Sequence, residues 1–318
     1  MQHATQLARC FERWRESLKR AAHFAVAAFL LGACAQVQPG YDLPPSGRIE
    51  LAAASLDPIS RYRAILDRAQ PANVAFTKAA RAELTRGGTL RAAINYGNSV
   101  LATRGMDGTP HGVSVDIAGE LARQLMVPVS LVPYPSAAQT MEGLKRGEWD
   151  IAFFAIDPAR ANEAAFTAPY LFIDGAYAVP ARSTLARVEQ IDQPGVRVVV
   201  GLGSAYDLHL SRTLKRAALV RVKTSPVVAD ELIKGGYEAA AGLRPQLEAD
   251  AKRLPGLRML DGNFTRIEQA MAVPRGTQET QAALNAFLAG LRESGFLAES
   301  LRRHGVQGAS LAATSAEK

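Results

Sequence analysis

The chain has 318 residues, of which 48% are hydrophobic and 21% charged, so it can bury a sizeable core and is not disordered over most of its length. Its formal net charge is +7, but the basic residues are scattered and form no dense cluster interleaved with aromatic residues, which argues against nucleic-acid binding. Two cysteines, Cys10 and Cys34, are too few for a disulfide framework or a multi-cysteine zinc site.

Residues 1–33 have the pattern of an export signal. Five Lys or Arg and two Glu lie between residues 9 and 20, and the apolar run Ala21–Leu31 follows. A helix of this length spans about 16 Å, roughly half of a bilayer core, so the run predicts a cleaved signal peptide; the alternative is a buried N-terminal helix. The motif LGAC (31–34) resembles a bacterial lipobox, whereas ACA (33–35) also suits ordinary signal peptidase. We prefer the lipobox and expect a periplasmic or cell-envelope protein that is lipid-anchored through Cys34.

The segment 34–84 differs in character from the rest of the chain. Pro-Gly and Pro-Pro pairs punctuate its start, and two helical stretches follow, near 59–69 and 75–84. We predict that this segment is a tether with a small N-terminal appendage.

From residue 90 onward, strand-like and helical patterns alternate. The first group is a strand at 90–95, a helix at 116–126, a strand at 127–132, a helix at 137–146 and a buried strand at 150–154. The second group is a strand at 197–201, a helix at 204–215, a strand at 218–222, a helix at 228–234, a strand at 238–241 and a helix at 246–252. An extended segment at 264–273 and helices at 278–292 and 295–304 close the chain, and residues 309–318 are predicted to be a disordered tail. Such alternation indicates an α/β fold with two mainly parallel units.

Several sequence motifs, in the order in which they occur, resemble those of a known family. They are GTLRAAIN (88–95), HGVSVDIAGELARQL (111–125), GLKRGEWDIAF (143–153), DPARANEAAFTAPY (157–170), PGVRVVVGLGSAYDL (194–208) and AMAVPRG (270–276). Together with the closing helices they resemble the bacterial extracellular solute-binding protein family 3, the periplasmic receptors of polar amino-acid ABC transporters. The resemblance covers residues 85–308, about 70% of the chain.

The resemblance implies a two-lobed, type II periplasmic-binding-protein fold with two crossover strands and a ligand cleft between the lobes. Lobe 1 would comprise residues 85–174 plus 268–308, and lobe 2 residues 175–267, with crossovers near 172–176 and 265–269. It also implies a monomer that binds a small amino acid or related organic anion, that partners an ABC transporter membrane permease and that needs no metal or cofactor.

Arg160 is the main candidate for ligand binding. It follows a predicted buried strand that ends with Phe153, Phe154 and Ala155, and in open α/β sheets ligands bind beyond the carboxyl ends of strands. A guanidinium is a planar fork that can bind a carboxylate through two hydrogen bonds. In the family, an arginine at this position clamps the α-carboxylate of the ligand. We include Phe154, Ala155 and Asp157 in the predicted site; the alternative is a surface arginine at a helix start and phenylalanines in the core.

The motif GLGSAYD (201–207) follows a strand and opens a helix. Ser204 and Asp207 form a capping-box pattern, and free N–H groups at a helix start attract anions. The resemblance implies that Gly203 and Ser204 donate to the same carboxylate from the second lobe, with Tyr206 and Asp207 nearby. A dinucleotide-binding loop is excluded because Tyr206 stands where its third glycine should be. A capped helix without a ligand is the alternative.

Asn95 and Asn98 lie in the first strand-to-helix loop and are predicted to contact the ligand, although asparagine is also common in turns. Family members often place an acid in this loop, where Asn95 falls. The family's acid in the second lobe, which pairs with the α-ammonium of the ligand, falls on Leu243 or Arg244. An α-ammonium would then be buried unpaired, which is costly, so we expect the site to hold a small organic anion, or an amino acid bound in a different way.

An enzyme on the same scaffold is the alternative function. The sequence contains no HExxH, GxSxG or P-loop motif, and we assign no catalytic residue. A periplasmic dehydratase of the cyclohexadienyl dehydratase type would need a carboxylic acid in the cleft to protonate a leaving hydroxyl. Glu238, Asp207 and Asp174 are the available acids.

Overall fold

The structure, a computed structural model, describes residues 71–275 and 278–312, which fall within one unit of the chain, Leu56–Lys318. The expected signal peptide (1–33), the expected lipidation site Cys34, most of the segment 34–84 and residues 313–318 of the expected tail lie outside the described residues. Within the described ranges, none of the helices is long and apolar enough to cross a membrane.

The described chain forms one large sheet, a two-stranded hairpin and nine α-helices. The strands are β1 (Leu90–Asn95), β2 (Thr103–Arg104), β3 (Pro110–His111), β4 (Val129–Tyr134), β5 (Ile151–Ala155), β6 (Ala164–Phe166), β7 (Leu171–Pro180), β8 (Arg197–Gly201), β9 (Ala218–Val222), β10 (Ala239–Leu243), β11 (Leu257–Met259), β12 (Thr265–Pro274) and β13 (Ala309–Leu311). The helices are α3 (Lys78–Leu84), α4 (Val113–Leu125), α5 (Ala137–Lys145), α6 (Pro158–Ala161), α7 (Ala205–Thr213), α8 (Val228–Lys234), α9 (Arg244–Arg253), α10 (Gln278–Glu293) and α11 (Phe296–Arg303).

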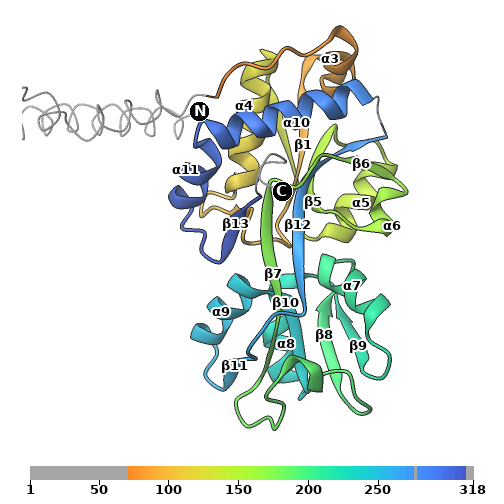
Figure 1. The fold of residues 1–318 in the computed structure, drawn as a ribbon, viewed down its shortest axis with the longest axis vertical. Helices are drawn as coiled ribbons and strands as arrows, with labels where there is room; N and C mark the ends of the chain where they lie inside the picture. Colours follow the sequence, from red (N-terminus) through yellow and green to blue (C-terminus); the bar gives the residue numbers. More distant parts are fainter. Residues whose placement is uncertain (1–70, 276–277, 313–318) are drawn as a thin grey trace, which may run out of the picture. The chain divides into compact units, whose positions relative to one another are not determined.

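Two long antiparallel strands, β7 and β12, join two α/β lobes (Figure 1). The strand order is β4-β1-β5-β12-β7-β10-β8-β9. Lobe 1 is built on the parallel strands β4, β1 and β5, and lobe 2 on the parallel strands β10, β8 and β9. The two expected crossover segments pair with each other, with Thr265 opposite Gly175 and Gln269 opposite Leu171. This is the two-lobed fold with two crossover strands that the sequence predicts.

In lobe 1, sequence periodicity explains how the helices attach to the sheet. Ile117, Leu121 and Leu125 are spaced at four-residue intervals on α4, and all three are buried in the main core. On α5, the side chain of Ser136 caps the first turn by accepting a hydrogen bond from the Gln139 N–H at 3.3 Å. Helices α4 and α5 both pack on β1 and β4, so the carboxyl ends of β1 and β5 stay free to form the site.

Lobe 2 repeats this arrangement with shorter elements. Helix α7 packs on β8, β9 and β10, and α8 packs on β8 and β10. The strands are short and almost wholly apolar, as is typical of parallel strands with both faces covered. Because β8 and β10 are parallel, Gly201 and Leu243 end at the same edge of the sheet, facing the Asn95 and Ala155 ends of lobe 1 across the site.

Two expectations about the chain ends are wrong within the described residues. Ala309–Leu311 is not a disordered tail but strand β13, which pairs with the lobe-1 half of β7. The described part of the segment 34–84 is not an appendage, because α3 packs on α10 and buries Ala80 and Leu84 in the main core. The strand β13 was missed because three residues are too few to show a periodicity. The packing of α3 could not be predicted because it depends on the apolar face of α10, which is distant in the sequence.

Candidate functional site

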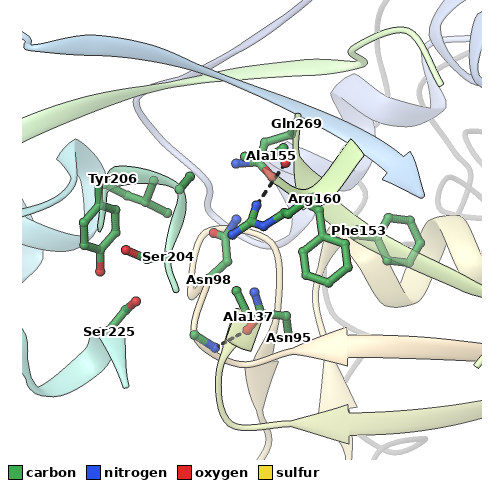
Figure 2. A pocket seen from close by; sticks show the side chains of 14 residues that line it. Asn95, Asn98, Ala137, Phe153, Ala155, Arg160, Ser204, Tyr206, Ser225 and Gln269 are labelled. Carbon is green, nitrogen blue, oxygen red and sulfur yellow. Dashed lines mark hydrogen bonds between the residues drawn. The ribbon is translucent and has the colours of Figure 1, made fainter. Parts of the chain in front are cut away.

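The carboxyl ends of β1, β5, β8 and β10 surround a small cavity between the lobes (Figure 2). Its volume is about 30 Å³, room for only a water molecule or two. The cavity is lined by Asn95, Gly97, Asn98, Ala137, Phe153, Phe154, Ala155, Arg160, Ser204, Ala205, Tyr206, Ser225, Leu243 and Gln269.

Arg160 supplies the only cationic side chain among the described residues that line this cavity. It lies on the short helix α6, which Pro158 and the side chain of Asp157 start directly after β5. The arginine is 4% exposed, and its Cζ lies 5.0 Å from the centre of the Phe154 ring. Burial lowers the pKa of Arg160 to about 10, and the nearby Asp157 charge acts in the opposite sense. The guanidinium is therefore still charged at neutral pH.

Main-chain carbonyls of both lobes hold the Arg160 guanidinium. Nη1 donates to the Ala155 oxygen at 2.9 Å in lobe 1, and Nη2 donates to the Gly203 oxygen at 2.8 Å in lobe 2. Both acceptors are neutral, so a ligand carboxylate, which is a stronger acceptor, could replace them as the partner of the guanidinium.

The start of α7 brings lobe 2 to the cavity. Ser204 Oγ accepts a hydrogen bond from the Asp207 N–H at 3.1 Å, which is the expected cap. Asp207 Oδ2 accepts from the Gly203 N–H at 2.9 Å, one residue before the N–H that a capping box would use. Tyr206 is 2% exposed, and burial raises its pKa to about 12 while the Ser225 and Ser204 hydroxyls act in the opposite sense.

Amide side chains line the lobe-1 side. Asn95 Oδ1 accepts a hydrogen bond from the Gly97 N–H at 2.9 Å, so it shapes the turn after β1. Asn98 in the same loop is 9% exposed, and Gln269 on β12 is 2% exposed. Asn98 Oδ1 and Gln269 Oε1 are buried and have no hydrogen-bond partner within the described part of the chain.

Seven of the ten predicted ligand-binding residues lie together at this cavity; they are Asn95, Asn98, Phe154, Ala155, Arg160, Ser204 and Tyr206. Phe153, on the same strand as Phe154 and Ala155, also lines it. The remaining three do not. Asp157 Oδ2 accepts from Arg212 Nη2 at 2.7 Å, Asp207 Oδ1 accepts from Arg221 Nε at 2.9 Å, and Gly203 turns its carbonyl to Arg160.

Sequence reasoning missed several lining residues. They are Gly97, Ala137, Ala205, Ser225 and Gln269. Gln269 lies at the end of the segment expected to be the second crossover, so its place in the chain was a usable signal. The others are small residues whose approach to the cavity depends on how the lobes meet.

The two lobes touch directly around the cavity. Besides the Arg160–Gly203 hydrogen bond, the ion pair between Asp157 and Arg212 joins α6 of lobe 1 to α7 of lobe 2. Gly203 has a φ of +67°, and a Cβ placed on it would lie 2.9 Å from the Cβ of Ala138 on α5. A solute of amino-acid size can therefore enter only if the lobes first move apart.

A second, larger cavity is lined by residues that follow three of the first cavity's lining residues in the chain by one or two positions. It has a volume of about 550 Å³, and Ser99, Pro226 and Pro245 in its wall follow Asn98, Ser225 and Leu243 of the first cavity.

None of the described residues that line the Arg160 cavity carries a carboxyl group. The family's acid was expected at Leu243 or Arg244. Leu243 lines the cavity and is 4% exposed, whereas Arg244 donates to Asn263 Oδ1 at 2.7 Å. The acids considered for a dehydratase lie elsewhere: Glu238 pairs with Arg197 at 2.8 Å, and Asp174 accepts from Asn263 at 2.7 Å. In the described ranges, no group of three His, Cys, Asp or Glu residues could hold a metal ion.

The chain belongs to the bacterial extracellular solute-binding proteins, family 3, whose model matches residues 90–307. It is 30% identical over 153 residues to a cyclohexadienyl dehydratase of Pseudomonas aeruginosa, a match that covers 46% of this chain and only 56% of that protein. It is 25% identical over 214 residues to the L-cystine-binding protein TcyJ of Escherichia coli, covering 66% of this chain and 80% of that protein. The solute receptor for L-cysteine of Neisseria gonorrhoeae has a similar fold, with a TM-score of 0.63 and 23% identity over 70% of this chain and 92% of that one.

Proposed function

We propose that this protein is the solute receptor of an ABC importer and that it captures a small carboxylate-bearing solute by closure of its two lobes. The observation that carries this proposal is the charged Arg160 guanidinium, which is buried between the lobes and bonded to two neutral carbonyls. Asp157 lies near enough to oppose the lowering of the Arg160 pKa by burial, but its carboxylate pairs with Arg212. A buried charge without a directly bonded counter-ion is costly, and a solute carboxylate would supply one.

Closure follows from the way the site is divided. Arg160 and Asn98 belong to lobe 1, and the start of α7 with Ser204 belongs to lobe 2, so only the closed form contacts the solute from both sides. The solute then shifts the balance between open and closed forms through its higher affinity for the closed form. Two charge-assisted hydrogen bonds at about 1.5–3 kcal/mol each, with apolar contacts, can support the roughly −8 kcal/mol of a micromolar complex.

A dehydratase on the same fold is the second candidate, because one relative carries that name. Dehydration needs a group that protonates the leaving hydroxyl, usually a carboxylic acid or histidine. No such group lines the Arg160 cavity in the part of the chain that the structure describes, and this favours the receptor. Incubation of the purified protein with prephenate and arogenate tests the alternative, since turnover of either would refute a purely binding function.

The proposal also covers where the protein is located and what it delivers its solute to. We infer export through residues 1–33, a lipid anchor at Cys34, a periplasmic or cell-envelope location, and a monomer that delivers its solute to a membrane permease. Intact mass measurement of the protein from membranes tests the anchor: a mature chain that starts at Cys34 and carries acyl mass supports it, and an unmodified chain refutes it.

The direct test of the binding site is calorimetry with a panel of amino acids and organic acids. Arg160→Met should weaken the binding of every carboxylate that the wild-type protein binds by at least about a hundredfold, the lower estimate for two charge-assisted hydrogen bonds. Arg123→Met removes an exposed arginine that pairs with Glu120 on α4, so it is the matched control and should bind as the wild type does. Retained binding in Arg160→Met would show that the site is elsewhere.

A further inference from the structure

Two buried acceptor atoms at the Arg160 cavity have no hydrogen-bond donor. Asn98 Oδ1 and Gln269 Oε1 belong to side chains that are 9% and 2% exposed, and neither oxygen has a partner among residues 71–275 and 278–312. Buried polar atoms in folded proteins are normally paired, and an unpaired one costs about 1–3 kcal/mol. Both side chains line the same cavity as the guanidinium, so a solute bound there is placed to supply the donors (Figure 2).

The charge of the cavity restricts what kind of donor fits. Arg160 contributes one positive charge, and the other lining residues are neutral, including the two amides. When the lobes close around a solute with one negative charge, the solute and the lining residues together are neutral. A zwitterionic amino acid leaves one net positive charge in a site shielded from bulk solvent, where like charges repel strongly.

If the carboxylate of an α-amino acid is bound at Arg160, its α-ammonium cannot reach an acid outside this cavity. In an α-amino acid the nitrogen is attached to the carbon next to the carboxylate, so a carboxylate at Arg160 holds the ammonium beside it. The acids of the neighbouring cavity have partners of their own: Glu248 lies 3.5 Å from Arg244, and Asp250 lies 2.8 Å from Arg253. Amide oxygens are then the acceptors within reach, and they provide dipoles but no compensating charge.

We infer that the cavity selects a carboxylate with a single negative charge whose neighbouring donor is neutral, such as an α-hydroxy acid, over the corresponding α-amino acid. This inference rests on the proposed function, since it needs a carboxylate at Arg160. The hydroxyl of the solute donates to Asn98 Oδ1 or Gln269 Oε1, and the second oxygen faces another donor of the solute or a water molecule that enters with it.

The test compares isosteric pairs by calorimetry at pH 7.5: L-lactate with L-alanine, L-glycerate with L-serine, and L-phenyllactate with L-phenylalanine. The hydroxy acid should bind at least about tenfold more tightly than its amino partner, which corresponds to about 1.4 kcal/mol. Tighter binding of the amino acids would overturn the inference and leave the proposed carboxylate receptor standing. If no member of any pair binds, and no other carboxylate of the wider panel does, both proposals fail together.

Charged variants test which residues discriminate. Gln269→Glu and Asn98→Asp each place a carboxylate where the structure has an unpaired amide oxygen, so each should shift the preference toward the amino acid by about tenfold or more. Gln278→Glu adds the same charge at an exposed position on α10 and should leave the preference unchanged. Thermal melts identify variants that fold, and two folded variants with an unchanged preference would refute the assignment of these amides.

Discussion

Replacement of Gly203 by alanine offers the sharpest test of lobe closure. The residue has a φ of +67°, which L-residues with a side chain rarely adopt, and a Cβ there would lie 2.9 Å from the Cβ of Ala138 across the lobe boundary. Gly147 has the same φ of +67°, and among the described residues no atom lies within 4 Å of its added Cβ. The two variants therefore share the backbone strain and differ in the contact between lobes.

The expected magnitudes separate these two effects. A left-handed backbone costs a residue with a Cβ about 1–2 kcal/mol, so both variants should lose a similar free energy of unfolding. An extra methyl group in a close-packed contact costs about 1–3 kcal/mol, and this cost applies to Gly203→Ala only when the lobes are closed. Its apparent affinity for the solute should therefore fall about five- to 150-fold, because closure becomes less favourable.

The measurements are calorimetry with the tightest ligand of the carboxylate panel and small-angle X-ray scattering with and without it. We expect Gly203→Ala to need more ligand for compaction, and Gly147→Ala to bind and compact as the wild type does. Equal affinity and equal compaction in both variants would refute the prediction that closure around the solute brings Gly203 against Ala138.

Three further predictions concern charged groups. Burial lowers the pKa of Arg160 from 12.5 to about 10, so at neutral pH the charge of this residue destabilises the folded state by about 3 kcal/mol. This destabilisation disappears as the pH rises from about 10 toward 12.5, because the folded protein then loses the proton first. The two hydrogen bonds of this side chain offset a similar amount, so Arg160→Met should change the melting temperature of the ligand-free protein by less than about 5 °C, and a collapse of the fold would contradict this. Arg212→Met removes the half-exposed pair with Asp157, worth about 0.5–1 kcal/mol, so scattering should show a more open ligand-free protein, and an unchanged curve would count against a closing role. Asp150→Asn breaks a pair in which both oxygens of a fully buried carboxylate bind Arg91, and the melting temperature should fall by about 5–10 °C; a fall of less than 2 °C would be the contrary result.

Local patterns predicted much of the framework. The sequence placed strand β8 at Arg197–Gly201 and helix α8 at Val228–Lys234, with the bounds that the structure has. It also placed Arg160 after the strand that ends at the cavity. These successes share a cause: apolar periodicity, caps and turn residues act between neighbours in the chain, so they can be recognised without knowing the fold.

Contacts between distant segments could not be predicted in the same way. Asp207 has the position of a helix-capping acid, but its carboxylate binds Arg221, which only the pairing of β8 with β9 brings near. Asp157 was grouped with the ligand-binding residues, yet its partner is Arg212 of the other lobe. In both cases the partner of the carboxylate is an arginine from another element, and its position depends on the tertiary structure.

The sequence by itself determined the main alternating strands and helices, the family resemblance and the lack of the family's second-lobe acid at Leu243 or Arg244, because residue identity and local spacing are sufficient for all three. Only the tertiary structure decided that Gln269 joins Asn98 and Arg160 around one cavity, and that neither amide oxygen has a donor among the residues that the structure describes. The reason is physical: hydrogen bonding and burial depend on distances in space, and residues far apart in the sequence acquire those distances only when the two crossover strands bring the lobes together.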